Sequence, residues 1–276
     1  MLQLGAMHFD CPAVMGILNV TPDSFSDGGR FASTGPALRQ ALRMADEGAA
    51  IIDVGGESTR PGAADVGEQE ELDRVVPVIE AIRREIDLPV SIDTSKPRVM
   101  REAVAAGASM INDIRALRED GALEAAVELQ CAVCLMHMQG QPRTMQVEPH
   151  YDDVVAEVAD FLRGRVADCR VAGLAADRIV IDPGFGFGKT PAHNFELLGN
   201  LRQLSAIGVP LLIGVSRKTS LGVITGRDVG SRLAASIAAA VLAVYQGAQI
   251  VRAHDVAETV DALRVTRAVI DEGLNL

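Results

Sequence analysis

The sequence lacks a segment that could cross a membrane as a helix: no stretch approaches the ~20 uninterrupted apolar residues required. Its N-terminus, Met1 to Phe9, has no basic start followed by an apolar run, so we expect no secretory signal. Cysteine is scarce, with 4 in 276 residues. Few cysteines and no signal fit a reducing compartment, and we expect a cytoplasmic protein.

Basic residues are in the minority. Lys and Arg number 26 against 37 Asp and Glu, which gives a formal net charge of −11. This excess of acid argues against nucleic-acid binding, which requires a basic surface. An anionic small-molecule substrate remains possible, because a local basic cluster can dominate one cleft.

Two of the cysteines, Cys131 and Cys134, have the CxxC spacing found in zinc and redox sites. They lie in the apolar run Cys131–Met136, which predicts a strand. Residues three apart on a strand point to opposite faces, so one metal ion could not easily bind both thiols. We therefore expect buried, structural cysteines.

Apolar runs alternate with helical segments along the whole chain. The apolar runs that predict strands are Val14–Val20, Ala50–Val54, Pro89–Asp93, Ser109–Asn112, Cys131–Met136, Arg178–Asp182, Pro210–Val215 and Gln249–Ala253. Segments that predict helices include Glu68–Glu85, Asp153–Ala172, Ser231–Gln246 and Val256–Glu272. This order predicts a parallel sheet whose strands are covered on both faces. Eight such units, in a length near the roughly 250 residues typical of the fold, predict a single-domain (β/α)8 TIM barrel over residues 1–276.

Polar or charged residues follow all eight predicted strands, at the barrel end where such enzymes place their chemistry. The acidic and amide members are Asp53, Asp93, Asn112 and Asp182. The basic members are Arg60, Lys189, Arg217, Lys218, Arg252 and His254. Carboxylates and amides suit a flat heterocycle rich in N–H groups, and Arg suits phosphate. We predict a heterocyclic substrate that carries phosphate or pyrophosphate, although some of these charges could instead be salt bridges between loops.

The segment Gly184–Thr190 follows a predicted strand and resembles a nucleotide-binding P-loop. That motif needs four residues between its first Gly and the Gly-Lys-Thr, and here only three separate Gly184 from Gly188. We therefore do not expect a P-loop.

A set of motifs lies at the strand ends. The first, Gly16–Gly29, reads GILNVTPDSFSDGG, and the second, Asp53–Gly62, reads DVGGESTRPG. Six shorter motifs are Ser91–Thr94, Ile111–Asp113, Leu135–His137, Ile181–Phe187, Gly214–Lys218 and Val251–Asp255. Together these motifs resemble those of the dihydropteroate synthase family. The resemblance runs from about residue 14 to 255, with one small departure: Thr219 stands where the family more often has Ser.

The resemblance implies a reaction and a set of site residues. The family joins 4-aminobenzoate to 6-hydroxymethyl-7,8-dihydropterin pyrophosphate, releasing pyrophosphate and 7,8-dihydropteroate, a folate precursor. The residues that would hold or line the pterin are Asp93, Asn112, Asp182, Lys218, Met136, Phe187 and Gly214. Those that would face pyrophosphate are Arg252 and His254, with Asn19 as the ligand of a magnesium ion. Those that would close the site or shape the aminobenzoate pocket are Phe25, Asp27, Thr59, Arg60, Pro61, Phe187 and Thr219.

Of these residues, the resemblance assigns the catalytic roles to Asp93, Lys218, Arg252 and His254. It also implies a homodimer and competition by sulfonamide analogues of aminobenzoate. Two alternatives stay open: a pterin-binding barrel that uses methyltetrahydrofolate, and a non-catalytic relative. The first has no use for the Ser-Thr-Arg-Pro and Ser-Arg-Lys stretches, and the second would be expected to have lost Asn19, Arg252 or His254.

Overall fold

The computed structural model describes residues 1–10, 12–21, 34–58, 65–141 and 144–271 of the chain. In these ranges, parallel strands form one eight-stranded sheet in the order β8-β7-β6-β5-β4-β3-β10-β9. Its strands are β3 (Ala13–Asn19), β4 (Ile51–Gly55), β5 (Val90–Asp93), β6 (Met110–Asp113), β7 (Ala132–Met136), β8 (Ile179–Asp182), β9 (Leu212–Ile213) and β10 (Ile250–Ala253). A parallel bridge between Ile181 and Leu211 joins β8 to β9 and closes the barrel.

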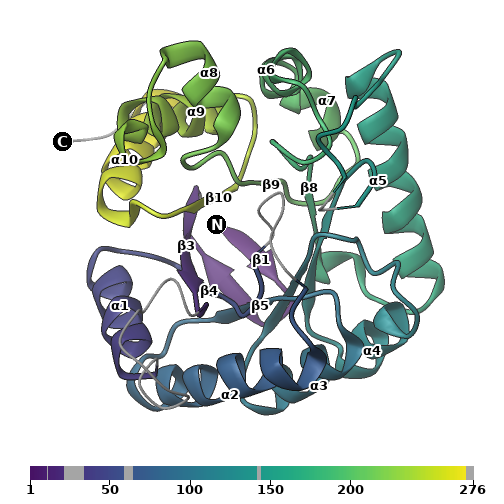
Figure 1. Cartoon of the computed structure of the whole chain (residues 1–276), viewed down its shortest axis with the longest axis vertical. Coiled ribbons are helices and arrows are strands. Elements are labelled where there is room, and N and C mark those ends of the chain that lie inside the picture. The colour runs from purple at the N-terminus through teal and green to yellow at the C-terminus, as the bar shows by residue number, and fades with distance from the viewer. Residues whose placement is uncertain (11, 22–33, 59–64, 142–143, 272–276) are drawn as a thin grey trace.

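Helices surround this sheet as a ring (Figure 1). The α-helices are α1 (Thr34–Asp46), α2 (Glu68–Glu85), α3 (Pro97–Ala105), α4 (Ala122–Leu129), α5 (Val154–Val171), α6 (Pro191–Gly199), α7 (Leu201–Ser205), α8 (Thr219–Thr225), α9 (Leu233–Tyr245) and α10 (Val256–Ile270). Two short 3-10 turns are η2 (Ala176–Arg178) and η3 (Val229–Ser231). The predicted (β/α)8 barrel is therefore confirmed. None of the described helices is long and apolar enough to cross a membrane.

Local sequence accounts for the bounds of several elements. Asp153 is the N-cap of helix α5, and its carboxylate accepts hydrogen bonds from the backbone N–H groups of Val155 and Ala156. Strand β9 is much shorter than predicted. Pro210 has no N–H to donate to a ladder, and the chain turns after Val215, where the Lys218 N–H donates to the Val215 carbonyl.

The apolar core has two parts, one between strands and helices and one inside the barrel. An N-terminal hairpin of β1 (Leu2–Leu4) and β2 (Met7–Phe9), which we did not predict, belongs to the inner part. Its buried side chains pack against strand residues such as Met15 and Val180. In Figure 1 the hairpin lies in the middle of the ring. It fills the barrel at the end opposite the carboxyl ends of the strands.

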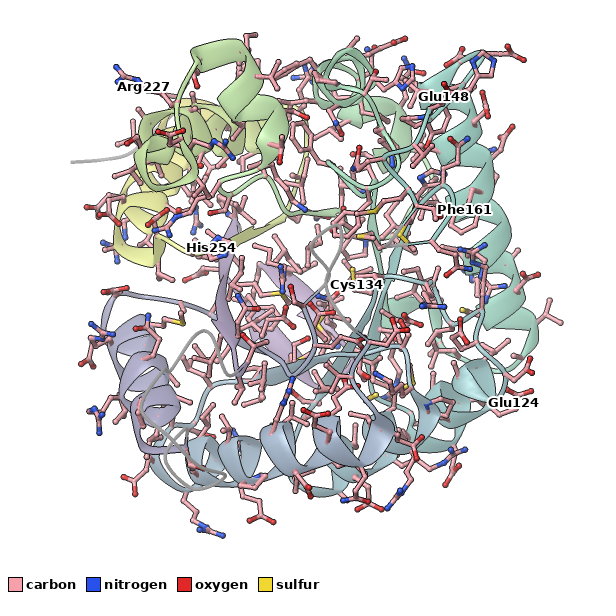
Figure 2. The ribbon with its side chains drawn as sticks, viewed as in Figure 1. Glu124, Cys134, Glu148, Phe161, Arg227 and His254 are labelled. Carbon is pink, nitrogen blue, oxygen red and sulfur yellow. The ribbon has the colours of Figure 1, made fainter. Side chains whose placement is uncertain are left out.

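The CxxC pair divides between these two parts of the core. Cys134 packs with the inner residues, and Figure 2 shows it within the ring of strands. Cys131 packs with the outer residues. Burial raises the pKa of the Cys131 thiol to about 11 and that of Cys134 well above its ordinary value. The two thiols are therefore buried on opposite faces, as predicted.

Candidate active site

The strand register brings the predicted site residues to one level at the mouth of the barrel. Asn19 on β3 and Asp93 on β5 lie opposite Gly55 of the intervening strand. On its other side, Asp93 lies opposite Asn112 of β6. A Cβ atom built on Gly55 would lie 3.5 Å from the Asp93 Cβ and 3.8 Å from the Asn19 Oδ1. The absence of a side chain at Gly55 thus leaves space between these polar groups.

Arg252 connects two of the strand ends through its guanidinium. Its Nε donates to the Asp53 Oδ2 at 2.6 Å, and its Nη2 donates to the Asp93 Oδ2 at 2.8 Å. The same Asp53 oxygen accepts from the Asn112 Nδ2 at 3.2 Å. Asp53 was predicted as one of the carboxylates that suit a heterocycle, whereas the structure shows that it orients both Arg252 and Asn112. In the sequence, the feature that marks Asp53 is that it is the one charged residue inside the apolar run Ile51–Val54.

A second group of predicted residues meets where β7 and β8 end. Asp182 is buried, and its Oδ1 accepts from the Gly184 N–H at 2.7 Å. Met136 lies opposite Asp182 in the register and shares a small apolar cluster with Phe187. The Lys218 Nζ lies 4.0 Å from the centroid of the Phe187 ring, within the range of a cation–π contact. A carboxylate, an aromatic face and an ammonium therefore converge on this side of the mouth.

The remaining predicted residues follow β9 and β10. Gly214 lies beside Arg252, because a Cβ built on it would be 3.9 Å from the Arg252 Cβ. Thr219 is the exposed first residue of α8. The backbone N and the ring Nδ1 of His254 lie 3.2 and 3.0 Å from the Ser216 Oγ, which fixes the orientation of the imidazole. Ser216 lies within the predicted motif Gly214–Lys218, but no role was predicted for it.

Burial changes the protonation of the groups around Arg252. Burial raises the pKa of Asp93 to about 7, although Arg252 opposes this shift. Burial, assisted by Arg252, lowers the pKa of Lys218 to about 8 and that of His254 to about 4. Hence at neutral pH Lys218 is mostly charged and His254 is neutral. His254 was predicted as a basic member of the mouth, and in the free protein it instead offers a neutral ring.

Lys189, another predicted basic member of the mouth, has a different role. It is 2 % exposed, and its Nζ lies 2.9 Å from the His137 Nδ1, 3.1 Å from the Gly184 carbonyl and 3.0 Å from the Phe187 carbonyl. Burial lowers the pKa of Lys189 to about 7. The three acceptors match the three N–H groups of an ammonium and so offset part of the cost of burying its charge. Lys189 therefore holds the turn beneath Phe187. This arrangement agrees with the prediction that Gly184–Thr190 is not a P-loop.

Arg217 is also used within the protein. Its guanidinium makes two hydrogen bonds to the carboxylate of Asp255, one of them 3.0 Å long from Nε to Oδ2. Arg217 therefore forms a salt bridge between loops, the alternative that the sequence left open to a contact with substrate. Five predicted residues lie outside the described part of the chain: Phe25, Asp27, Thr59, Arg60 and Pro61.

Among the described residues, no group of three or more His, Cys, Asp and Glu side chains is arranged to hold a metal ion. Asn19 Oδ1 nevertheless faces the space over Gly55 that Asp93 also lines. Magnesium prefers oxygen ligands, keeps several waters and often has few protein contacts. One amide oxygen at this position would fit such an ion.

Comparison with known proteins identifies the family. A model of pterin-binding enzymes matches residues 15–254. The dihydropteroate synthase of Escherichia coli strain K12 is 54% identical over 259 residues, which cover 94% of this chain and 92% of that protein. The chain belongs to the dihydropteroate synthase family. The family's enzymes are transferases of folate biosynthesis that release pyrophosphate.

Solved structures of this family have the same fold. The dihydropteroate synthase of Yersinia pestis, in complex with a sulfonamide drug, has a TM-score of 0.93 at 51% identity, with 98% of this chain and 99% of that chain covered. The Xanthomonas albilineans enzyme with 4-aminobenzoic acid has a TM-score of 0.90 at 54% identity, covering 96% and 95%. With 7,8-dihydropteroate, that enzyme has a TM-score of 0.88 at 51% identity, covering 97% of each chain.

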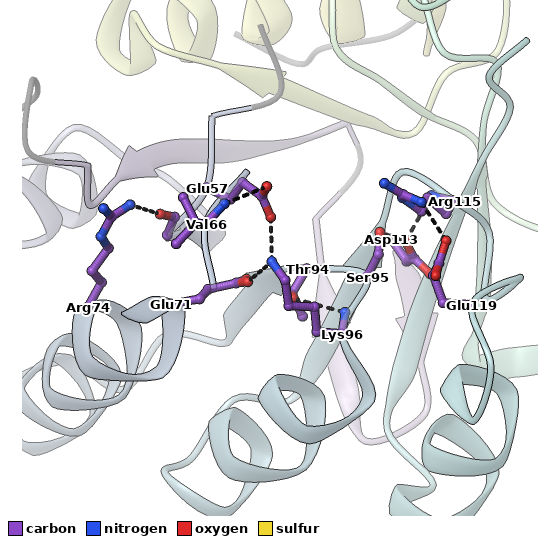
Figure 3. A network of polar contacts seen from close by, with 11 residues as sticks. Glu57, Val66, Glu71, Arg74, Thr94, Ser95, Lys96, Asp113, Arg115 and Glu119 are labelled. Atoms are coloured by element: carbon purple, nitrogen blue, oxygen red, sulfur yellow. Dashed lines mark hydrogen bonds and ion pairs between the residues drawn. The ribbon is translucent and has the colours of Figure 1, made fainter. Parts of the chain in front are cut away.

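In this member of the family, a network of charges beneath the mouth joins the loops after β4 and β5 (Figure 3). The Lys96 ammonium bonds to the carboxylates of both Glu57 and Glu71. Glu57 also accepts from the Val66 N–H at 3.2 Å, and Arg74 donates to the Gly56 carbonyl at 2.7 Å. Glu71 is fully buried, and burial raises its pKa although Lys96 opposes the shift. Lys96 thus compensates a buried carboxylate and holds Glu57 shortly after β4.

Asp113 holds the segment 94–96, which follows β5 and includes Lys96. The Ser95 hydroxyl donates to the Asp113 carboxylate, which also accepts from the backbone N–H groups of Arg115 and Leu117, each at 2.8 Å. Figure 3 shows both halves of this network around residues 94–96. Because Asp93 immediately precedes this turn, the network supports its position.

We predict that Lys96→Met lowers the free energy of unfolding by about 3 kcal/mol, because it leaves the buried Glu71 carboxylate without its cation. Adding Glu71→Gln should restore most of that loss. The control is Arg98→Met on the neighbouring helix α3, whose partner Glu68 is exposed and whose loss should cost less than about 1 kcal/mol. Urea unfolding of the four proteins measures these differences, and equal losses for the two single variants would contradict the role given to Lys96.

Proposed function

We propose that this chain catalyses the condensation of 6-hydroxymethyl-7,8-dihydropterin pyrophosphate with 4-aminobenzoate, giving 7,8-dihydropteroate and pyrophosphate. The observation that carries the proposal is the position of Arg252, whose guanidinium bonds to Asp53 and Asp93, with the amide of Asn112 on the same Asp53 oxygen. Such a mouth accommodates a heterocycle and a phosphate next to each other. The substrates of a methyltetrahydrofolate-using barrel include no pyrophosphate, and the 54% identity to a synthase also favours this reaction.

The pterin would be held at the inner part of the mouth. Asp182 keeps Oδ2 for a ligand while Oδ1 accepts from the Gly184 N–H, and a carboxylate suits the N–H edge of an aminopyrimidinone. Asn112 supplies an amide, and Lys218 supplies an ammonium above Phe187. The aromatic ring of Phe187 and the thioether of Met136 would pack against the flat ring, with Gly214 leaving space beside Arg252.

The leaving group would lie toward Arg252 and His254. Negative charge gathers on pyrophosphate as its C–O bond breaks, and a fixed guanidinium stabilises that charge more in the transition state than in the ground state. His254, neutral and oriented by Ser216, would donate a hydrogen bond rather than a charge. Asp93 would stabilise the positive charge that develops at the methylene carbon. A magnesium ion held at Asn19 would supply further positive charge to pyrophosphate.

The second substrate would enter from the side of Phe187 and Thr219. Phe25 and Pro61 would complete its pocket, and Asp27, Thr59 and Arg60 would close over the site. The amine of 4-aminobenzoate is aromatic and neutral at neutral pH, so its nitrogen can attack the methylene carbon without a general base and then lose a proton to water. We further propose that residues 1–276 form one pterin-binding domain in the cytoplasm.

The direct test is pyrophosphate release by the purified protein, with the product identified by mass. We expect turnover that requires the pterin pyrophosphate, 4-aminobenzoate and magnesium, and that chelation of the metal stops. Lys218→Ala and Arg252→Ala should each lower kcat/KM by about 100-fold or more, because each removes a charge that faces the reacting groups. Arg264→Ala, which removes an exposed guanidinium from α10, should have no effect. Pterin binding without turnover would instead indicate a non-catalytic relative.

The pKa values of the mouth predict a bell-shaped pH profile for kcat/KM, which reports the free enzyme. Below about pH 7, Asp93 takes up a proton and loses the charge that the reaction uses. Above about pH 8, Lys218 loses its proton and its attraction for the pterin. In Asp93→Asn the acid limb should disappear from the remaining activity, which separates Asp93 from titration of the substrate. A wild-type profile that is flat between about pH 6 and 9 would contradict these assignments.

We also propose a homodimer formed through α8, α9 and α10, which pack next to one another (Figure 1). Their outer faces carry exposed large apolar side chains: Val223, Ile224, Leu233, Leu242, Tyr245, Val265, Val269 and Ile270. Exposed large apolar residues on three adjoining helices suit a protein interface.

Placing a charge on this face should separate the subunits. We expect Leu242→Glu to convert the dimer to a monomer in sedimentation velocity, because burying an unpaired carboxylate in an interface is costly. Val171→Glu, at an equally apolar but isolated position at the end of α5, should leave the dimer intact. A wild-type protein that sediments as a monomer at micromolar concentration would refute the proposed interface.

A further inference from the structure

Asn194, in helix α6, joins two segments to which the proposed function gives substrate contacts. Its side chain is fully buried. The Oδ1 accepts from the Gly186 N–H at 2.7 Å, and the Nδ2 donates to the Ser220 Oγ at 2.9 Å. Gly186 immediately precedes Phe187 in the turn after β8, and Ser220 immediately follows Thr219 in α8. One carboxamide therefore connects the backbone beside Phe187 with the side chain beside Thr219.

The chemistry of the neighbours fixes the orientation of this carboxamide. The Gly186 N–H can only donate, so it must face the amide oxygen. The Nδ2 also lies 3.3 Å from the Lys189 carbonyl and 2.9 Å from the Thr190 carbonyl, which can only accept. A flipped amide would place like groups together at three of the four contacts. The bridge thus has one arrangement, and a buried polar group satisfied in this way specifies the local structure.

Helix α6 does not need Asn194 to begin. The helix has its own capping box, in which the Thr190 Oγ1 accepts from the His193 N–H at 3.2 Å and the His193 Nδ1 accepts from the Thr190 N–H at 3.3 Å. Pro191 at the first helical position also favours a helix start. The contacts of Asn194 to Gly186 and Ser220 therefore serve the loops rather than the helix.

The spacing that the bridge controls is tight. Gly184, Gly186 and Gly188 all have positive φ, at 68°, 85° and 60°, so no regular ladder holds this turn. A Cβ on Gly186 would lie 3.1 Å from the Lys218 Cδ, and the Lys218 Nζ is 4.0 Å from the Phe187 ring centroid. A shift of either segment by a few tenths of an ångström would change the distance between Phe187 and Thr219.

We infer that Asn194 is a positioning residue: by tying Gly186 to Ser220 it fixes the distance between Phe187 and Thr219, and with it the pocket for the aromatic amine substrate. This inference rests on the proposed function, which places 4-aminobenzoate between those two residues. The pterin is held mainly by groups that Asn194 does not contact, such as Asp182 and Asn112. Loss of the bridge should therefore affect aminobenzoate much more than pterin.

The test is steady-state kinetics of Asn194→Ala, Ser220→Ala and the double variant. We expect the KM for 4-aminobenzoate to rise about tenfold in Asn194→Ala and about threefold in Ser220→Ala, with kcat within about threefold of wild type. The double variant should be no worse than Asn194→Ala, because both changes break one bridge. The Kd of the pterin pyrophosphate, measured by calorimetry without aminobenzoate, should change less than about twofold.

A role limited to stability would lower kcat through loss of folded enzyme and leave KM unchanged, and this result would overturn the inference. Independent, multiplicative effects of the two single variants would overturn it as well. Ser220→Ala removes only a hydroxyl and provides the test if Asn194→Ala does not fold.

The matched control is Asn200→Ala at the other end of α6. The Asn200 Nδ2 donates only locally among the described residues, to the Glu196 carbonyl at 2.8 Å, so its removal should leave the KM for 4-aminobenzoate unchanged. An equal rise in KM for this control would also refute the role of Asn194. If wild type and Asn200→Ala both produce no dihydropteroate, the proposed function fails, whereas normal KM values in every variant defeat only the role of Asn194.

Discussion

The half-buried guanidinium of Arg252 is the charge around which the mouth of the barrel is organised. Removing a cation from water costs roughly several kcal/mol in hydration free energy, unless carboxylates and hydrogen bonds offset this cost. Asp53 and Asp93 provide this compensation from two strands that neighbour each other in the barrel. The guanidinium in turn opposes the rise in the pKa of Asp93 and helps to lower the pKa values of Lys218 and His254. One fixed charge thus influences the protonation of three of its neighbours.

The same requirement explains the contacts farther from the mouth. Lys189 is enclosed beneath the turn after β8, with two backbone carbonyls and an imidazole nitrogen as its acceptors. Lys96 lies between Glu57 and the buried Glu71. Each of these cations bonds to residues that follow a strand, so compensating the charge also fixes those residues. Contacts within the protein therefore fix these described parts of the loops.

The sequence was sufficient to predict the barrel, because a strand covered on both faces must be a nearly continuous apolar run. The hairpin of β1 and β2 was missed because its strands are only three residues long. Its signal was the alternation of Leu2, Leu4, Met7 and Phe9 around Gly5. The roles of single charges were harder to predict. Lys189 and Lys218 both follow a strand and a glycine-containing turn, and only the path of the backbone decides which ammonium reaches the mouth and which is enclosed.

That path depends on close contact between two backbones. A Cβ on Gly184 would lie 1.9 Å from the His137 carbonyl oxygen, and one on Gly188 would lie 2.4 Å from the Gln139 carbonyl oxygen. No side chain other than hydrogen fits at either position. The turn after β8 can therefore lie directly against the segment after β7, which brings the carbonyls of Gly184 and Phe187 to Lys189 and leaves Lys218 to occupy the face of the Phe187 ring.

The charges at the mouth also bear on how an anion would bind. The described residues place three carboxylates there, Asp53, Asp93 and Asp182, against two cations, Arg252 and Lys218, with His254 neutral. This balance does not by itself favour a multiply charged pyrophosphate, because each cation is already partly neutralised. Protonation of Asp93 would only cancel the excess negative charge, whereas a dication beside Asn19 would reverse it. Because Asp93 has a pKa of about 7, protonation alone would be half complete at neutral pH, and the dication is the more effective means. The proposed need for magnesium thus follows from the way in which the protein compensates Arg252.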